Sequence, residues 1–216
     1  MTYKAIIFDL DGTLLDTLED LADSMNQVLS KMRYPVHKTE AYKYFVGDGI
    51  EMLVRRVLPK EECSREIIDK CISEMLQEYA LRWSNKTRPY PGIMGTLDEL
   101  KKKKIVMSVL SNKLHDFTVK MVEKILPNHS FEMVVGAGAD FPRKPDTAGA
   151  LEIAGKLRIS PEMFVFLGDT GTDMATASAA GMFGVGAYWG FRTAEELLDF
   201  GAKRIIRKPE ELLEFF

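Results

Sequence analysis

Two pairs of aspartates are the side chains of this sequence best suited to chemistry. Asp9 and Asp11 stand two residues apart near one end of the chain, and Asp169 and Asp173 stand four residues apart near the other. If folding brings them together, two carboxylates ~4 Å apart repel by about 4 kcal/mol at an effective dielectric of ~20. A hard divalent cation relieves this repulsion, and an all-oxygen set of ligands without histidine suits magnesium.

A hydroxyl, an amide and an ammonium group form a second set of candidates. Ser111 and Asn112 are adjacent, and Lys144 precedes Pro145. Magnesium held by few carboxylates commonly completes its shell with water and substrate phosphate, to which Ser111 and Lys144 would add hydrogen bonds and charge. Taken singly, each of these segments has a simpler interpretation as a turn, a helix cap or a loop. Their combination favours one phosphate-binding crevice.

The elements that must position these side chains are strands of a parallel sheet. Outside residues 16–88, short apolar runs alternate with helical patterns, which is typical of an α/β fold with helices on both faces of the sheet. Ligands of such sheets bind outside the carboxyl ends of the strands, and the polar candidates follow four of these runs. The predicted strands are residues 4–8, 105–110, 131–135, 164–167, 183–187 and 204–206.

Residues 16–88 break the alternation and are predicted to be helical throughout. Apolar residues recur there at intervals of three and four, as in the series that begins at Leu18, Leu21 and Met25. We therefore expect a small all-helical domain at 16–88, inserted directly after the first strand of a core made of residues 1–15 and 89–216. The return through residues 88–92, with two prolines and a glycine, suits a stiff connector.

Composition narrows the possible partners and location. The 216 residues carry a formal net charge of -3, which offers no large basic surface to nucleic acid. We expect no membrane partner either, because no stretch approaches the ~18 apolar residues of a membrane helix. The first residues lack the features of a signal peptide, and Cys63 and Cys71 lack a metal or redox spacing, so we expect a cytoplasmic protein with reduced thiols, a monomer or homodimer.

Four motifs in order resemble those of the haloacid dehalogenase superfamily, and within it the phosphoglycolate phosphatase-like group with a helical cap. The resemblance covers the whole chain and implies a Rossmann-like core whose inserted helices form a cap over the crevice. The function that the resemblance implies is magnesium-dependent hydrolysis of a small phosphorylated metabolite, a phosphate monoester like phosphoglycolate. The motifs are residues 9–13, Ser111-Asn112, Lys144-Pro145 and 168–173.

The resemblance also implies roles for the acidic residues. Asp9 would be the nucleophile that forms an aspartyl-phosphate, and Asp11 the general acid and base. Magnesium would be held by Asp9, by the backbone carbonyl of Asp11 and by Asp169. Asp173 would orient a metal-bound water or Lys144.

The remaining roles concern phosphate and the cap. Ser111, Asn112 and Lys144 would bind the phosphoryl group, with Thr13 bracing the loop beside it. The cap loop that reaches the active site would be formed by Gly47, Asp48 and Gly49, with a plain interhelical turn as the alternative. Arg192, after the fifth strand of the core, is a further candidate to meet a substrate anion.

Two positions bear on the choice of reaction. Members that cleave carbon–halogen bonds lack an acid at the position of Asp11, so this residue favours a phosphatase. Helical-capped sugar mutases carry a cap histidine where this chain has Leu21, which favours water as the acceptor. Two segments, Asp146-Thr147 and Gly171-Thr172, depart from the phosphoglycolate phosphatase pattern. The remaining alternatives are therefore an inorganic pyrophosphatase, a nucleotidase, a sugar-phosphate phosphatase or phosphomutase, and a catalytically idle phosphate-binding module.

Overall fold

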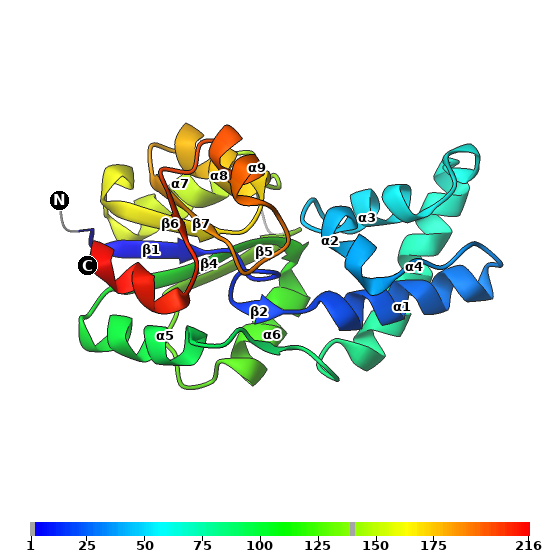
Figure 1. The fold of residues 1–216 in the computed structure, drawn as a ribbon, viewed down its shortest axis with the longest axis horizontal. Coiled ribbons are helices and arrows are strands. Elements are labelled where there is room, and N and C mark those ends of the chain that lie inside the picture. The colour runs from blue at the N-terminus through cyan, green and yellow to red at the C-terminus, as the bar shows by residue number, and fades with distance from the viewer. Residues whose placement is uncertain (1–2, 139–140) are drawn as a thin grey trace.

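The fold is a six-stranded parallel sheet with helices on both faces and a separate group of helices beyond one end. The computed structural model describes residues 3–138 and 141–216. The strands lie in the order β5-β4-β1-β6-β7-β8, so the first strand is central, and all neighbours are parallel. In Figure 1 the carboxyl end of β1 points toward the separate group of helices, α1 to α4. The predicted α/β class and all six predicted strands are confirmed.

The bounds of the elements follow the predicted pattern closely. The strands are β1 Ala5–Phe8, β2 Leu15–Asp16, β3 Arg88–Pro89, β4 Val106–Leu114, β5 Met133–Ala137, β6 Phe164–Gly168, β7 Phe183–Ala187 and β8 Arg204–Ile206. The helices are α1 Leu18–Lys31, α2 Tyr42–Phe45, α3 Ile50–Val57, α4 Arg65–Arg82, α5 Ile93–Lys102, α6 His115–Ile125, α7 Ala148–Leu157, α8 Gly171–Ala179 and α9 Ala194–Asp199. Short 3-10 turns lie at Thr39–Ala41, Lys60–Glu62, Pro161–Met163 and Pro209–Phe215.

Each strand of the sheet contributes to two apolar layers because successive side chains point to opposite faces. In β1, Ile6 and Phe8 pack in the layer beneath α5 and α6, whereas Ala5 and Ile7 pack in the layer beneath α7 and α8. Figure 1 shows these two pairs of helices on opposite sides of the sheet. All four residues of β1 are buried, as expected for a strand covered on both faces.

Strand β4 differs from its prediction in a way that matters for the site. It was expected to end at Leu110, but it continues to Leu114. Its pairing with β5 jumps from Leu110 opposite Val135 to Leu114 opposite Ala137, which leaves residues 111–113 in a bulge. A bulge re-aims the side chains of its strand. Ser111 and Asn112 therefore lie within this irregular stretch rather than after the strand.

The helices α1 to α4 pack around an apolar cluster of their own, which includes Met25, Val54, Ile68 and Met75. They join the sheet through two short segments, β2 and β3, which pair antiparallel with Leu15 opposite Pro89 and Asp16 opposite Arg88. The division into a core and a cap at residues 16–88 stays a proposal. Throughout the described residues, the helices are too short or too polar to span a membrane.

Candidate active site

The predicted carboxylates meet at the carboxyl ends of neighbouring strands. Asp9 follows β1 and Asp169 follows β6, and β1 and β6 pair directly. Asp173 lies in the first turn of α8. Each of the three offers a carboxylate oxygen within 4.8 Å of the others, and all three are buried. Three acidic groups at such spacing form a set of ligands for a cation.

Lys144 neutralises part of this acidic charge. Its Nζ lies 2.7 Å from Oδ1 of Asp9 and 2.6 Å from Oδ1 of Asp173, and its side chain is almost fully buried. Burial alone would lower the pKa of Lys144, but the two carboxylates raise it above the ordinary value. The lysine therefore holds a positive charge directly beside Asp9.

The pKa of Asp9 indicates that Lys144 alone does not offset the cost of burying this carboxylate among other acidic groups. Its pKa is raised to about 7, chiefly because the carboxyl is buried; Lys144 lowers it, while Asp173 and Asp11 raise it. Burial and the nearby carboxylates of Asp9 and Asp173 likewise raise the pKa of Asp169. A divalent cation among these oxygens would stabilise their charged forms.

Asp169 is held in place from two sides. Thr13 Oγ1 donates a hydrogen bond of 3.0 Å to its Oδ1, and the backbone N–H of Phe191 donates one of 2.8 Å to its Oδ2. Gly12 makes this approach possible. Its φ is +91°, and a Cβ there would come 2.3 Å from Oδ2 of Asp169. Thr13 thus holds the carboxylate of Asp169 in position, and its hydroxyl hydrogen is already donated to that carboxylate.

Asp173, like Asp169, has both carboxylate oxygens engaged, but one of its partners is the ammonium group of Lys144. Oδ1 accepts from Lys144, and Oδ2 accepts from the backbone N–H of Thr170 at 3.0 Å and from its hydroxyl at 2.6 Å. These bonds also form the N-terminal cap of α8. The arrangement supports the predicted task of Asp173, which is to orient Lys144.

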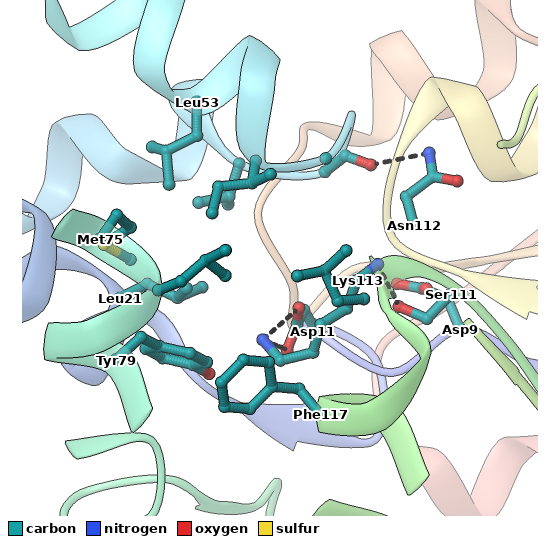
Figure 2. Close-up of a pocket in the computed structure, with 16 residues that line it drawn as sticks. Asp9, Asp11, Leu21, Leu53, Met75, Tyr79, Ser111, Asn112, Lys113 and Phe117 are labelled. Carbon is teal, nitrogen blue, oxygen red and sulfur yellow. Dashed lines mark hydrogen bonds and ion pairs between the residues drawn. The ribbon is translucent and has the colours of Figure 1, made fainter. Parts of the chain in front are cut away.

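Asp11 has a partner that sequence reasoning missed. Lys113 places its Nζ 3.0 and 3.2 Å from the two carboxylate oxygens of Asp11, and 4.5 Å from the ring centre of Tyr79 on α4 (Figure 2). Burial would lower the pKa of Lys113, but Asp11 and Tyr79 raise it above its ordinary value. The only sequence signal was its position next to Ser111 and Asn112, where an isolated lysine suggests an exposed loop.

Ser111 and Asn112 occupy different positions although they are adjacent. The Ser111 hydroxyl accepts a hydrogen bond of 3.2 Å from the N–H of Lys113, which leaves its own hydrogen able to donate. Asn112 uses its amide nitrogen on the carbonyl oxygens of Gly47 and Lys144, and its oxygen accepts from the N–H of Lys144. Both N–H groups of the Asn112 amide are thus committed to bracing Gly47 and Lys144, and its phosphate contact stays a prediction.

The loop of Gly47, Asp48 and Gly49 contacts residues of the sheet and of α8. Asp48 accepts a hydrogen bond of 2.7 Å from the hydroxyl of Thr172, and Gly47 accepts one from Asn112. Arg192 also contacts this region, with bonds to the carbonyl oxygens of Lys43 and Val46. Its guanidinium therefore serves the cap rather than standing free for a substrate anion.

A pocket opens between the sheet and the helices. Asp9, Asp11, Ser111 and Lys113 line its sheet side, and apolar residues of α1, α3 and α4 line the other (Figure 2). The predicted catalytic pair of Asp9 and Asp11 therefore faces one pocket. Such a concave pocket with a few convergent polar groups is the usual form of a small-molecule site.

The sequence profile of the haloacid dehalogenase-like hydrolases matches residues 6–187, which include the four aspartates of the site, Ser111, Asn112 and both lysines. The chain belongs to this family. The predicted resemblance is thus confirmed, and the sheet with its inserted helices is the fold of a haloacid dehalogenase-like hydrolase.

Relatives within the family carry phosphatase names. A phosphoglycolate phosphatase of Mannheimia succiniciproducens is 30% identical over 98% of this chain and 97% of its own length. One of Aquifex aeolicus is 28% identical over 98% and 95%. A provisionally named phosphoglycolate phosphatase from Lactobacillus delbrueckii subsp. bulgaricus has a crystal structure that matches with a TM-score of 0.93 at 28% identity, covering 99% of this chain and 98% of that one. The prediction that this haloacid dehalogenase-like hydrolase is a phosphatase is confirmed.

Proposed function

We propose that this phosphatase hydrolyses a small phosphate monoester through an aspartyl-phosphate on Asp9, with magnesium bound at the acidic cluster. The observation that carries the proposal is the position of Asp9, between the ammonium of Lys144 at 2.7 Å and the carboxylate of Asp169. The relatives named phosphoglycolate phosphatases support a substrate of that size. We further propose that the enzyme works in the cytoplasm as a monomer or homodimer.

The first half-reaction forms a bond between Asp9 and phosphorus. Lys144 holds Oδ1 of Asp9, so we assign the attack to Oδ2. As the bond from phosphorus to the ester oxygen breaks, Asp11 gives its proton to that oxygen and the alcohol leaves. Lys144 and the Ser111 hydroxyl compensate the charge on the phosphoryl oxygens.

The second half-reaction returns the enzyme to its starting state. The carboxylate of Asp11 takes a proton from water as the water oxygen attacks phosphorus. The bond between phosphorus and Asp9 then breaks, which releases inorganic phosphate and the free carboxylate. Leu21, which lines the pocket, has no group that could replace Asp11 in this proton transfer or direct the phosphoryl group to a sugar.

The residues present suit magnesium as the cofactor. Asp9, Asp169 and the backbone carbonyl of Asp11 would hold it, while Asp173 keeps Lys144 in position. When bound, the ion would stabilise the negative charge on the phosphoryl oxygens. Buried hard oxygen ligands without histidine favour magnesium over softer metals.

The test uses the purified full chain with an aryl phosphate. We expect hydrolysis with magnesium, loss with a chelator and recovery on adding magnesium back. Asp9→Asn should lower kcat by at least about 1000-fold, because an amide cannot form the intermediate. Asp11→Asn should trap a phosphorylated protein that mass spectrometry detects and that Asp9→Asn lacks. Full activity of Asp9→Asn would overturn the mechanism.

A further inference from the structure

The side of the pocket that faces away from the acidic cluster is apolar. Its lining on the helices consists of Leu21 on α1, Val46 before the cap loop, Ile50 and Leu53 on α3, and Met75 and Leu76 on α4. Figure 2 shows Leu21, Leu53 and Met75 across the pocket from Asp11 and Ser111. A substrate whose phosphoryl group lies at Asp9 would direct its leaving group toward these side chains.

Among the described residues that line the pocket, Lys113 is the only cation, and it is already paired. Lys113, which lines the pocket, contacts both carboxylate oxygens of Asp11. Of the arginines close to the cap loop, Arg56 pairs with Asp48, and Arg192 pairs with Glu196 as well as with cap carbonyl oxygens. The guanidinium of Arg143 lies against Gly49 of this loop but does not line the pocket. A substrate carboxylate placed beside Lys113 would also lie close to Asp11, which becomes negatively charged as it protonates the leaving group.

A negatively charged leaving group is therefore poorly matched to this pocket. Removing a carboxylate from water is costly unless a partner compensates its charge, whereas burying apolar surface is favourable. We infer that the substrate is a phosphate monoester with a small, uncharged, apolar leaving group. This inference rests on the proposed function and deepens it. It predicts a substrate about as large as phosphoglycolate whose leaving group lacks the carboxylate.

The volume of the pocket agrees with a small leaving group. The cavity measures about 70 Å³, which is room for about five water-sized groups. The leaving group should thus contain few heavy atoms.

A pair of substrates with the same shape tests the inference. Phosphoglycolate and isobutyl phosphate have leaving groups of nearly equal size, but only the former carries a carboxylate. With the full chain and magnesium, we expect kcat/KM to be at least about tenfold higher for isobutyl phosphate. Equal values, or a preference for phosphoglycolate, would overturn the inference.

A matched pair of variants tests whether the apolar wall causes this preference. Leu76 is half-buried on α4, where lysine and methionine are both good helix formers of similar length. Leu76→Lys should shift the kcat/KM ratio toward phosphoglycolate by at least about tenfold, whereas Leu76→Met should keep the wild-type ratio. An unchanged ratio in Leu76→Lys, with the fold intact by circular dichroism, would contradict the inference.

The two proposals fail in different ways. If neither ester nor an aryl phosphate is hydrolysed with magnesium, the proposed function is wrong. If both esters are hydrolysed and phosphoglycolate is preferred, the phosphatase stands and only the uncharged leaving group is wrong.

Discussion

At the scale of single residues, the ion pair between Lys113 and Asp11 is what positions the proposed acid and base. Asp11 is partly exposed, so without a partner its carboxylate would be able to adopt several rotamers. Lys113 restricts it through two contacts, and Tyr79 covers the lysine from the side of the cap. The proton donor is thereby connected to a helix that lies outside the sheet.

Replacing Lys113 with methionine tests this positioning. Lys113→Met keeps the length of the side chain but removes the charge that holds Asp11. General acid–base catalysis contributes about 100- to 10,000-fold, and we expect the loss of alignment to cost at least about tenfold in kcat with little change in KM. Steady-state kinetics on an aryl phosphate and on an alkyl phosphate give the measurement.

The choice of leaving group provides the control for Lys113→Met. An alkyl phosphate needs protonation of its leaving oxygen far more than an activated aryl phosphate does. A misplaced acid should therefore slow the alkyl substrate more than the aryl one, and Lys113→Arg should recover part of the loss. Equal slowing of both substrates would indicate general damage to the fold rather than a positioning role.

The polar residues differ in how far the sequence predicts them. Asp9, Lys144 and Asp169 were expected to meet because the carboxyl ends of parallel strands share one edge of the sheet. The contact of Lys113 with Tyr79 could not be predicted, because it depends on how a helix before the second core strand packs against the sheet. Asn112 was expected at phosphate, but its bonds to Gly47 and Lys144 depend on the same packing.

At the scale of elements, the connection between the helices and the sheet depends on Asp20 of α1. Its buried carboxylate accepts hydrogen bonds from the backbone N–H groups of Lys86 and Thr87, at 2.9 to 3.1 Å, and from the hydroxyl of Thr87 at 2.8 Å. Thr87 immediately precedes β3, which pairs with β2. One side chain thus fastens the returning connector to the start of the inserted helices.

Asp20→Asn should loosen this connection. The amide oxygen can take the place of Oδ2, which all three donors reach, but the charge and the second acceptor of the Lys86 N–H are lost. Hydrogen bonds to charged groups contribute about 1 kcal/mol more than neutral ones. We expect the free energy of unfolding to fall by about that amount and amide exchange at residues 86 and 87 to accelerate. Denaturant titration and hydrogen exchange measure the two effects.

Asp23 on the same helix is the matched control for Asp20. It pairs with Nζ of the same Lys86, but both groups are largely exposed to solvent. Exposed pairs contribute less than about 1 kcal/mol, so Asp23→Asn should leave exchange at residues 86 and 87 nearly unchanged. Similar effects of the two variants would show that the connector is not fastened by Asp20.

The sequence predicted these elements better than the bulge within them. Apolar periodicity predicted α1, α3 and α4, since each buries one face in the same cluster. It did not predict that β4 would continue past Leu110, because Ser111 and Asn112 interrupt the apolar run. The extension depends on pairing with β5 at Ala137, which is a contact between distant segments.

At the scale of the whole molecule, the helices lie closed over the sheet through polar contacts around one loop. Asp48 bonds with Thr172, Gly47 with Asn112, and Arg192 with the carbonyl oxygen of Val46. We expect these contacts to break and form again in each catalytic cycle, since a substrate must enter and phosphate must leave.

The contact at Asp48 has a defined pH dependence. Burial would raise the pKa of Asp48, but hydrogen bonds from Thr172 and Arg56 hold it below its ordinary value. A lowered pKa means that the contact contributes fully above the pKa of the unfolded carboxyl, ~3.9, and that its contribution is lost as the pH falls through the lower folded value. Closure should therefore not depend on this group above about pH 5.

Removing the partner of Asp48 should open the molecule without a change of pH. Thr172→Val keeps the shape of the side chain but leaves the carboxylate without the hydroxyl at 2.7 Å. We expect faster amide exchange at residues 46–50 and a KM raised by about threefold to tenfold, since a lost hydrogen bond to a charged group costs about 1 kcal/mol or more. Thr176→Val on the same helix removes a hydroxyl that bonds only to the carbonyl of Thr172, so exchange at residues 46–50 should stay at the wild-type rate. If both variants exchange alike, closure depends on the apolar contacts between helices and sheet, and the polar loop merely follows them.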